Sequence, residues 1–149
     1  MALLMHVKRL IERCDFRQQR CESTLKALSA SRTLLEDEIQ ALGRQREGML
    51  ELIHHERPQG ALLRSQLFMA HRRLAVLRAS IKSLQLEETQ LKEKLIELDQ
   101  QQRLIHESRH HWVRKAAKYQ SWLSKKRRSR LMTGLRLEEL DTEELSVWK

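Results

Sequence analysis

The sequence contains few residues that break helices, with only 4 Gly and 1 Pro among 149 residues. Aromatic residues make up 4% of the chain and charged residues 33%. This composition argues against sandwiches, barrels and nucleotide-binding α/β enzymes, and it is typical of coiled coils. The longest apolar run, residues 1–5, is far shorter than the roughly 18 residues that a membrane span needs. The N-terminal residues also lack the pattern of a secretory signal, so we expect a cytosolic protein.

Cysteine is equally rare, since Cys14 and Cys21 are the two that the chain contains. On a helix, seven residues separate them by about 10 Å. This exceeds the limit of about 7 Å between the Cα atoms of a disulfide. We therefore predict that both are small buried side chains in a reducing compartment.

Apolar residues recur every seven positions in the first part of the chain. One series consists of Val7, Cys14, Cys21, Leu28, Leu35, Leu42 and Met49. The accompanying series is interrupted by polar residues and consists of Leu4, Ile11, Gln18, Leu25, Arg32, Ile39, Arg46 and Ile53. A strict heptad sustained over this length predicts a left-handed coiled coil.

A second heptad repeat follows. Its first series consists of Leu63, Ala70, Leu77, Leu84, Leu91, Leu98, Ile105, Trp112 and Tyr119. The other consists of Leu67, Leu74, Ile81, Glu88, Leu95, Gln102, Arg109, Ala116 and Leu123. Two consecutive repeats predict two helices that bury these core positions against one another.

A short break separates the two repeats. Pro58 cannot continue a helix interior, and Gly60 tolerates the positive φ of a tight reversal. We therefore predict an all-α fold, a long antiparallel two-helix coiled-coil hairpin. The second helix should extend beyond the first, and this overhanging part is basic. A short acidic tail follows it. The predicted boundaries are 1–55 for the first helix, 56–60 for the turn, 61–133 for the second helix and 134–149 for a flexible acidic tail.

Positive charge is concentrated near the end of the second helix. Residues 108–136 contain ten Lys or Arg and no acid, whereas residues 137–149 contain five acids and one Lys. Trp112, Tyr119 and Trp122 lie within the basic stretch. Such a stretch can be a solvated helix face, a phosphate-binding surface or a protein interface, for which Trp, Tyr and Arg are the favoured anchors. Composition alone leaves these three interpretations open.

Catalytic motifs are not found in this sequence. His55-Glu56 begins like a zinc-protease helix, but Gln59 stands where the second His is needed. His106 and His110 are four residues apart without a further cluster of ligands. No phosphate-binding loop or nucleophile elbow is present. We therefore expect no enzymatic activity, no metal, no cofactor and no small-molecule substrate.

Motifs at both ends resemble the SpaM/InvI family of type III secretion systems. The C-terminal motif is Trp112-Val113-Arg114-Lys115 followed by Tyr119-Gln120-Ser121-Trp122, and then by a Lys/Arg cluster and an acidic tail. The N-terminal motif is Arg13-Cys14 followed by Cys21-Glu22-Ser23. The residues carried over are Cys14, Cys21, Trp112, Arg114, Lys115, Tyr119, Gln120 and Trp122.

The resemblance implies a central stalk, similar in role to flagellar FliJ and in shape to the gamma-subunit coiled coil of rotary ATPases. Its implied partners are the hexameric secretion ATPase and the export gate, and some family members are described as binding secretion chaperones. The implied location is the bacterial cytoplasm at the inner-membrane face, reached through these partners.

Two surfaces follow from this interpretation. The predicted ATPase-binding residues are Trp112, Arg114, Lys115, Lys118, Tyr119, Gln120, Trp122, Lys125, Lys126, Arg127 and Arg128. The predicted gate-facing tip contains His54, His55, Arg57 and Pro58. Two alternatives are a nucleic-acid-binding coiled coil and a homo-oligomeric structural coiled coil. The first is disfavoured because zipper-type DNA readers place the basic helix before the heptads.

Overall fold

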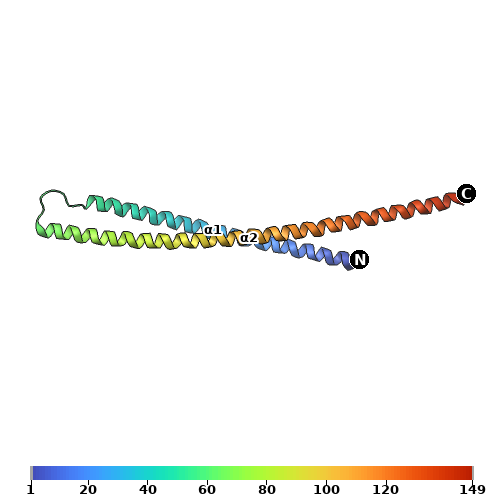
Figure 1. Ribbon diagram of the computed structural model, residues 1–149, viewed down its shortest axis with the longest axis horizontal. Coiled ribbons are helices and arrows are strands. Elements are labelled where there is room, and N and C mark those ends of the chain that lie inside the picture. Colours follow the sequence, from blue (N-terminus) through green and yellow to red (C-terminus); the bar gives the residue numbers. More distant parts are fainter. Residues whose placement is uncertain (1, 149) are drawn as a thin grey trace. The chain divides into compact units, whose positions relative to one another are not determined.

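The computed structural model describes residues 2–148, and within this range it contains two α-helices and no strand. Helix α1 spans Ala2–His55 and helix α2 spans Arg64–Val147 (Figure 1). The two helices pack against each other, so the predicted all-α helical hairpin is confirmed.

The chain forms two compact units, and one of them comprises Leu25–Arg103. In this unit α1 and α2 lie side by side and run in opposite directions (Figure 1). Its buried side chains include Leu74, Ile81 and Leu98, which all occupy core positions of the second heptad repeat. Because two helices cover only one face of each other, the core is narrow and most other side chains remain exposed.

The other unit comprises the chain up to Thr24 and from Leu104 onwards. Val7 and Cys14 of α1 are buried there, as are Ala116 and Leu123 of α2. All four occupy core positions of the predicted heptads. The repeat therefore identifies the buried face in both units.

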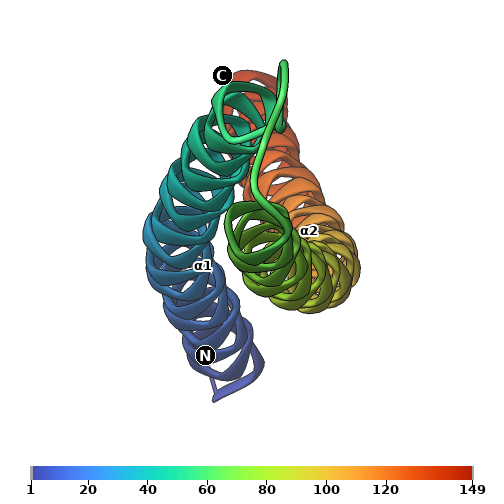
Figure 2. The same ribbon diagram turned by 90° about the vertical axis from the view of Figure 1, so that its left-hand side faces the viewer.

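Residues 56–63 form the connection between the helices, which Figure 2 shows end on. Gly60 has a φ of 80°, the left-handed conformation that glycine adopts without steric cost. Half-buried Pro58 lies just before it and prevents the chain from continuing as a helix. The loop thus reverses the chain as the sequence predicts, although it is longer than residues 56–60.

Helix α2 begins at Arg64 rather than at residue 61, and the predicted core positions Leu63 and Leu67 are exposed. At this end of the unit Glu56 of the loop lies 3.6 Å from Arg73 of α2, in an ion pair that is open to solvent. Leu63 itself belongs to the loop, and with Glu56 opposite Arg73 the residue opposite Leu67 belongs to the loop too. The end of α1 at His55 therefore leaves both leucines exposed. The prediction that the core begins at these two leucines is therefore wrong.

At its other end, α2 continues past residue 133 and through the acidic tail to Val147. Only Gly134 interrupts a sequence of helix-forming residues there, at a cost of about 1 kcal/mol relative to Ala. The tail is thus helical in the structure, and its flexibility stays a prediction.

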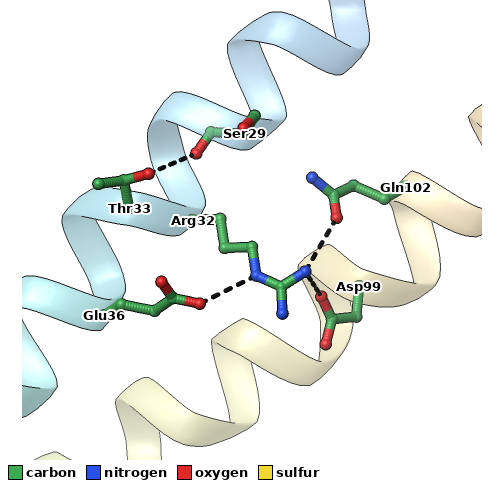
Figure 3. Close-up of polar contacts among 6 residues, drawn as sticks. All are labelled: Ser29, Arg32, Thr33, Glu36, Asp99 and Gln102. Carbon is green, nitrogen blue, oxygen red and sulfur yellow. Dashed lines mark hydrogen bonds and ion pairs between the residues drawn. The ribbon is translucent and has the colours of Figure 1, made fainter.

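Polar core positions pair across the unit that comprises Leu25–Arg103. Arg32 of α1 lies 2.9 Å from Asp99 Oδ1 and donates to Gln102 Oε1 at 3.4 Å (Figure 3). Its Nε also donates to Glu36 Oε1 at 3.0 Å. The hydrogen bond to Glu36, followed by the charge of Asp99, raises the pKa of Arg32. A group with a raised pKa stabilises the folded protein fully at every pH below its ordinary pKa. The contribution of charged Arg32 to the free energy of unfolding is therefore constant through the neutral pH range.

A second polar pair lies two heptads closer to the loop on both helices. Arg46 of α1 donates to Glu88 Oε2 at 2.7 Å, and Lys92 Nζ lies 3.1 Å from Glu88 Oε1. These pairs occupy core positions of the heptad repeat. Apolar residues at these positions would pack equally well in several registers of one helix against the other. Polar core residues of this kind specify the register of a coiled coil at some cost in stability.

Candidate partner-binding surface

The surface of interest is the basic end, which we define as residues 108–130 of α2. Its heptad positions Trp112, Ala116, Tyr119 and Leu123 face α1 and are buried or half-buried. The remaining helix positions are free for charged residues, because successive residues of a helix point in different directions. The basic end therefore combines a packed face with an exposed cationic face.

We call the exposed cations of this end together the cationic face. Arg114, Lys118, Lys125 and Arg128 lie on the side of α2 away from α1, whereas Lys126, Arg127 and Arg130 lie toward the α1 side. No ion pair is formed by any of them within residues 2–148. Their positive charge is consequently available to an acidic partner, and this attraction will weaken as salt is added.

Trp112 is half-buried between the two helices. Arg17 Cζ of α1 lies 5.5 Å from the Trp112 ring, and Lys115 Nζ of α2 lies 5.3 Å from it. His111 adds an edge contact, with its ring centroid 5.2 Å from that of Trp112. Cation–π contacts at such partly exposed sites contribute about 0.5–1 kcal/mol each. Trp112 therefore stabilises the packing of α1 against α2 at this end. Only the exposed part of its ring can contact a partner.

Trp122 is also half-buried, with Lys126 Nζ 5.8 Å from its ring centroid. It lines a groove of about 410 Å³ together with Leu3 and Leu4 of α1 and Leu137 of α2. The groove also contains the charged groups of Lys126 and Arg130. A partly covered aromatic ring beside cations is the composition of an interface anchor.

Arg109 and Glu22 link the helices at the start of the basic end. Arg109 Nη2 donates to Glu22 Oε1 at 3.0 Å, and the two side chains are 41% and 47% exposed. Cys21 Sγ, one residue before Glu22, lies 3.9 Å from Ser108 Oγ. These contacts align α1 with α2 where the cationic face begins.

The structure places the predicted residues in two separate groups. All eleven predicted ATPase-binding residues lie on α2 within the basic end. His54 and His55 end α1, while Arg57 and Pro58 lie in the loop. His54, His55 and Arg57 are exposed and Pro58 is half-buried. The two groups belong to different units.

Sequence reasoning missed an apolar groove near the loop. It has a volume of about 520 Å³ and is lined by Leu52, Glu56, Phe68, Met69, Arg72, Arg73, Val76 and Leu77. One signal could have located it: residues 57–86 contain six Lys or Arg and no acid.

Metal and membrane chemistry find no support in the part of the chain that the structure describes. No three His, Cys, Asp or Glu side chains between residues 2 and 148 gather as metal ligands. Neither α1 nor α2 contains a stretch apolar enough to cross a bilayer.

The structure defines an all-α helical hairpin with a strongly basic end. The chain belongs to the family described as Salmonella surface presentation of antigen gene type M protein, whose model matches residues 5–146. The resemblance to SpaM/InvI proteins is thereby confirmed, and the chain is a type III secretion-related protein. Searches of curated proteins and of solved structures gave no significant match.

Proposed function

We propose that this protein is the central stalk of a type III secretion apparatus, connecting the hexameric secretion ATPase to the export gate of the inner membrane. The observation that carries the proposal is the basic end, where a packed pair of helices presents exposed cations. In this role the protein supports ATPase assembly and activity, and through them export. It acts at the cytoplasmic face of the inner membrane.

A helical pair suits this role for a physical reason. A rod on the axis of a hexamer presents a different side chain to each of six otherwise equivalent subunits. It therefore stabilises a different conformation in each subunit and gives the ring a direction. Contacts that must be remade at every step should be electrostatic and exposed, as at Lys118, Lys125 and Arg127.

We assign the basic end to the ATPase and the loop with His54, His55, Arg57 and Pro58 to the export gate. The exposed cations and half-buried Trp122 support the first assignment, because they can bind acidic loops of the ATPase. A chaperone of exported proteins is a further partner that the same cationic face could bind.

The test measures the steady-state rate and oligomeric state of the cognate secretion ATPase with and without this protein. We expect stimulation and hexamer formation at low salt and a smaller effect at high salt. The variant Lys115→Glu/Lys125→Glu/Arg127→Glu should abolish both effects. The matched control Arg20→Glu/Lys26→Glu, with one fewer substitution on exposed α1 positions, should leave them unchanged. Equal affinity of the basic-end variant for the ATPase would contradict the assignment.

Nucleic acid is the second candidate partner, because four consecutive cations, Lys125 to Arg128, are exposed. Binding by counterion release would be lost steeply with salt and would need no aromatic anchor. Trp122→Ala therefore separates the two functions. It should weaken the ATPase complex and leave any nucleic-acid binding unchanged.

A further inference from the structure

The groove near the loop is open and apolar. Leu52 of α1 and Leu77 of α2 lie along it, and Phe68, Met69 and Val76 line it from α2. Phe68 is 73% exposed, and Met69 and Val76 are also exposed. Apolar side chains gathered around a groove, rather than scattered singly, indicate a binding surface. We call this surface the tip groove.

The tip groove is also electropositive. The six cations between residues 57 and 86 are Arg57, Arg64, Arg72, Arg73, Arg78 and Lys82. Glu56, the acid at the groove, is paired with Arg73 at 3.6 Å. Arg72 lines the groove and makes no ion pair within residues 2–148. The groove therefore suits a segment that is apolar on one face and negatively charged.

The chain itself contains a segment of this chemistry, residues 135–147 at the end of α2. Leu137, Leu140 and Val147 are exposed, and their spacing of three and ten residues places them on one helix face. The acids of the segment are Glu138, Glu139, Asp141, Glu143 and Glu144. None of them forms an ion pair in the described part of the chain.

We propose that the tip groove of one copy binds the acidic segment 135–147 of a second copy. The binding mode is a helix in a groove, in which the apolar face of the segment covers Phe68, Met69 and Val76. Glu144 lies within that face, between Leu140 and Val147, and Asp141 lies beside it. In the complex these two acids pair with Arg72, which makes no ion pair in the described part of the chain, and compete with Glu56 for Arg73. This inference goes beyond the proposed function and does not depend on it.

The contact is heterologous, because it joins two different surfaces of the same chain. A heterologous contact leaves one free groove and one free acidic segment at the ends of every assembly. Assembly size should therefore increase steadily with protein concentration. It should also decrease with salt, since the pairing charges are exposed.

Charge exchange in the full-length chain provides the test. Arg72→Glu/Arg73→Glu and, separately, Asp141→Lys/Glu144→Lys should each weaken self-association about tenfold or more in sedimentation velocity. A mixture of the two variants should associate again, because each groove then meets a segment of opposite charge. Arg20→Glu/Lys26→Glu is the control that should associate as the unaltered chain does. Phe68→Ser repeats the groove test without changing charge.

Photo-crosslinking from position 68, with a benzoylphenylalanine in place of Phe68, identifies the occupant. In a mixture of isotope-labelled and unlabelled chains, we expect crosslinks from position 68 of one copy to residues 135–147 of the other. Crosslinks confined to one copy, or directed to the basic end, would overturn the proposal. A monomer at every concentration would overturn it too, whether or not the chain stimulates the ATPase.

Discussion

Arg46 of α1 and Glu88 of α2 form the shortest side-chain ion pair between the two helices, with Nη1 2.7 Å from Oε2. Glu88 is only 7% exposed, although it is ionisable and occupies a core position. Lys92 binds its other oxygen at 3.1 Å, so both oxygens of the carboxylate have partners. A buried charge without a partner destabilises the folded protein, whereas a buried apolar residue needs no charged partner.

Removing one member of this pair should destabilise the protein more than removing both. We expect Arg46→Ala to lower the free energy of unfolding by about 1–3 kcal/mol, because Glu88 then keeps only Lys92. Arg46→Leu/Glu88→Leu should be neutral or stabilising in urea unfolding, since the core becomes continuous. Light scattering should show that this double variant forms additional oligomers. A double variant less stable than Arg46→Ala would contradict this account.

Arg32 makes more contacts than Arg46 but should matter less. Its side chain is 41% exposed and that of Asp99 is 39% exposed, so water screens the pair. Arg32→Ala should cost about 0–1 kcal/mol in the same unfolding experiment. Comparison with Arg46→Ala is the control, and an equal loss in both variants would show that burial of Glu88 has no special weight.

The two cysteines should respond differently to the same substitution. Cys14 is 2% exposed, and Cys14→Ser buries a hydroxyl in an apolar contact at a cost of about 1–3 kcal/mol. Cys21 is half-buried, with Ser108 Oγ 3.9 Å from its sulfur. Cys21→Ser should therefore change thermal stability by less than about 0.5 kcal/mol. Equal losses of stability would show that burial does not separate these positions.

Gly60 and Gly48 allow backbone freedom to be measured without changing packing. A Cβ at either position would meet no atom within 4 Å. Gly60→Ala should destabilise by about 1–2 kcal/mol, because Gly60 has a φ of 80°. Gly48→Ala should stabilise α1 by about 0.5–1 kcal/mol. Opposite shifts in the midpoint of thermal unfolding are expected, and shifts of the same sign would contradict the assigned conformation of Gly60.

The acidic segment 135–147 should exchange its amide hydrogens rapidly. Its side chains are exposed, and a helix without a packed face is marginally stable in water. Gly134→Ala should slow this exchange, since it favours continuation of the helix by about 1 kcal/mol. Hydrogen exchange in dilute solution measures both effects. Protection as strong as that around buried Leu123 would show that the segment is not flexible.

Much of this fold could be predicted because coiled-coil packing is periodic. Every predicted core position of α1 between Leu4 and Ile53 is buried or half-buried. Even the polar members of the series, such as Gln18 and Arg46, follow this rule. A heptad repeat fixes which face of a helix is covered, whatever residue occupies a given position.

The ends of the helices were less predictable, because periodicity says nothing about where a partner stops. Leu63 and Leu67 continue the repeat, yet α1 ends before it can cover them. The exposure of Phe68 depends in the same way on the neighbouring helix. The basic end can be predicted by counting charges along the sequence. The tip groove cannot, because its shape depends on how α1 and α2 are placed against each other.

The spacing of the polar pairs has a mechanical consequence for the unit that comprises Leu25–Arg103. A slip of one heptad in one direction would place Arg32 opposite Leu95 and Arg46 opposite Ile81. A slip in the other direction would place Arg46 opposite Leu95. Either shift would also separate Arg46 from Glu88, which is 7% exposed, at a cost of about 1–3 kcal/mol. The polar pairs therefore oppose sliding of one helix of this unit along the other when force acts along the helix axes. Twisting or bending of both helices together leaves the pairs intact.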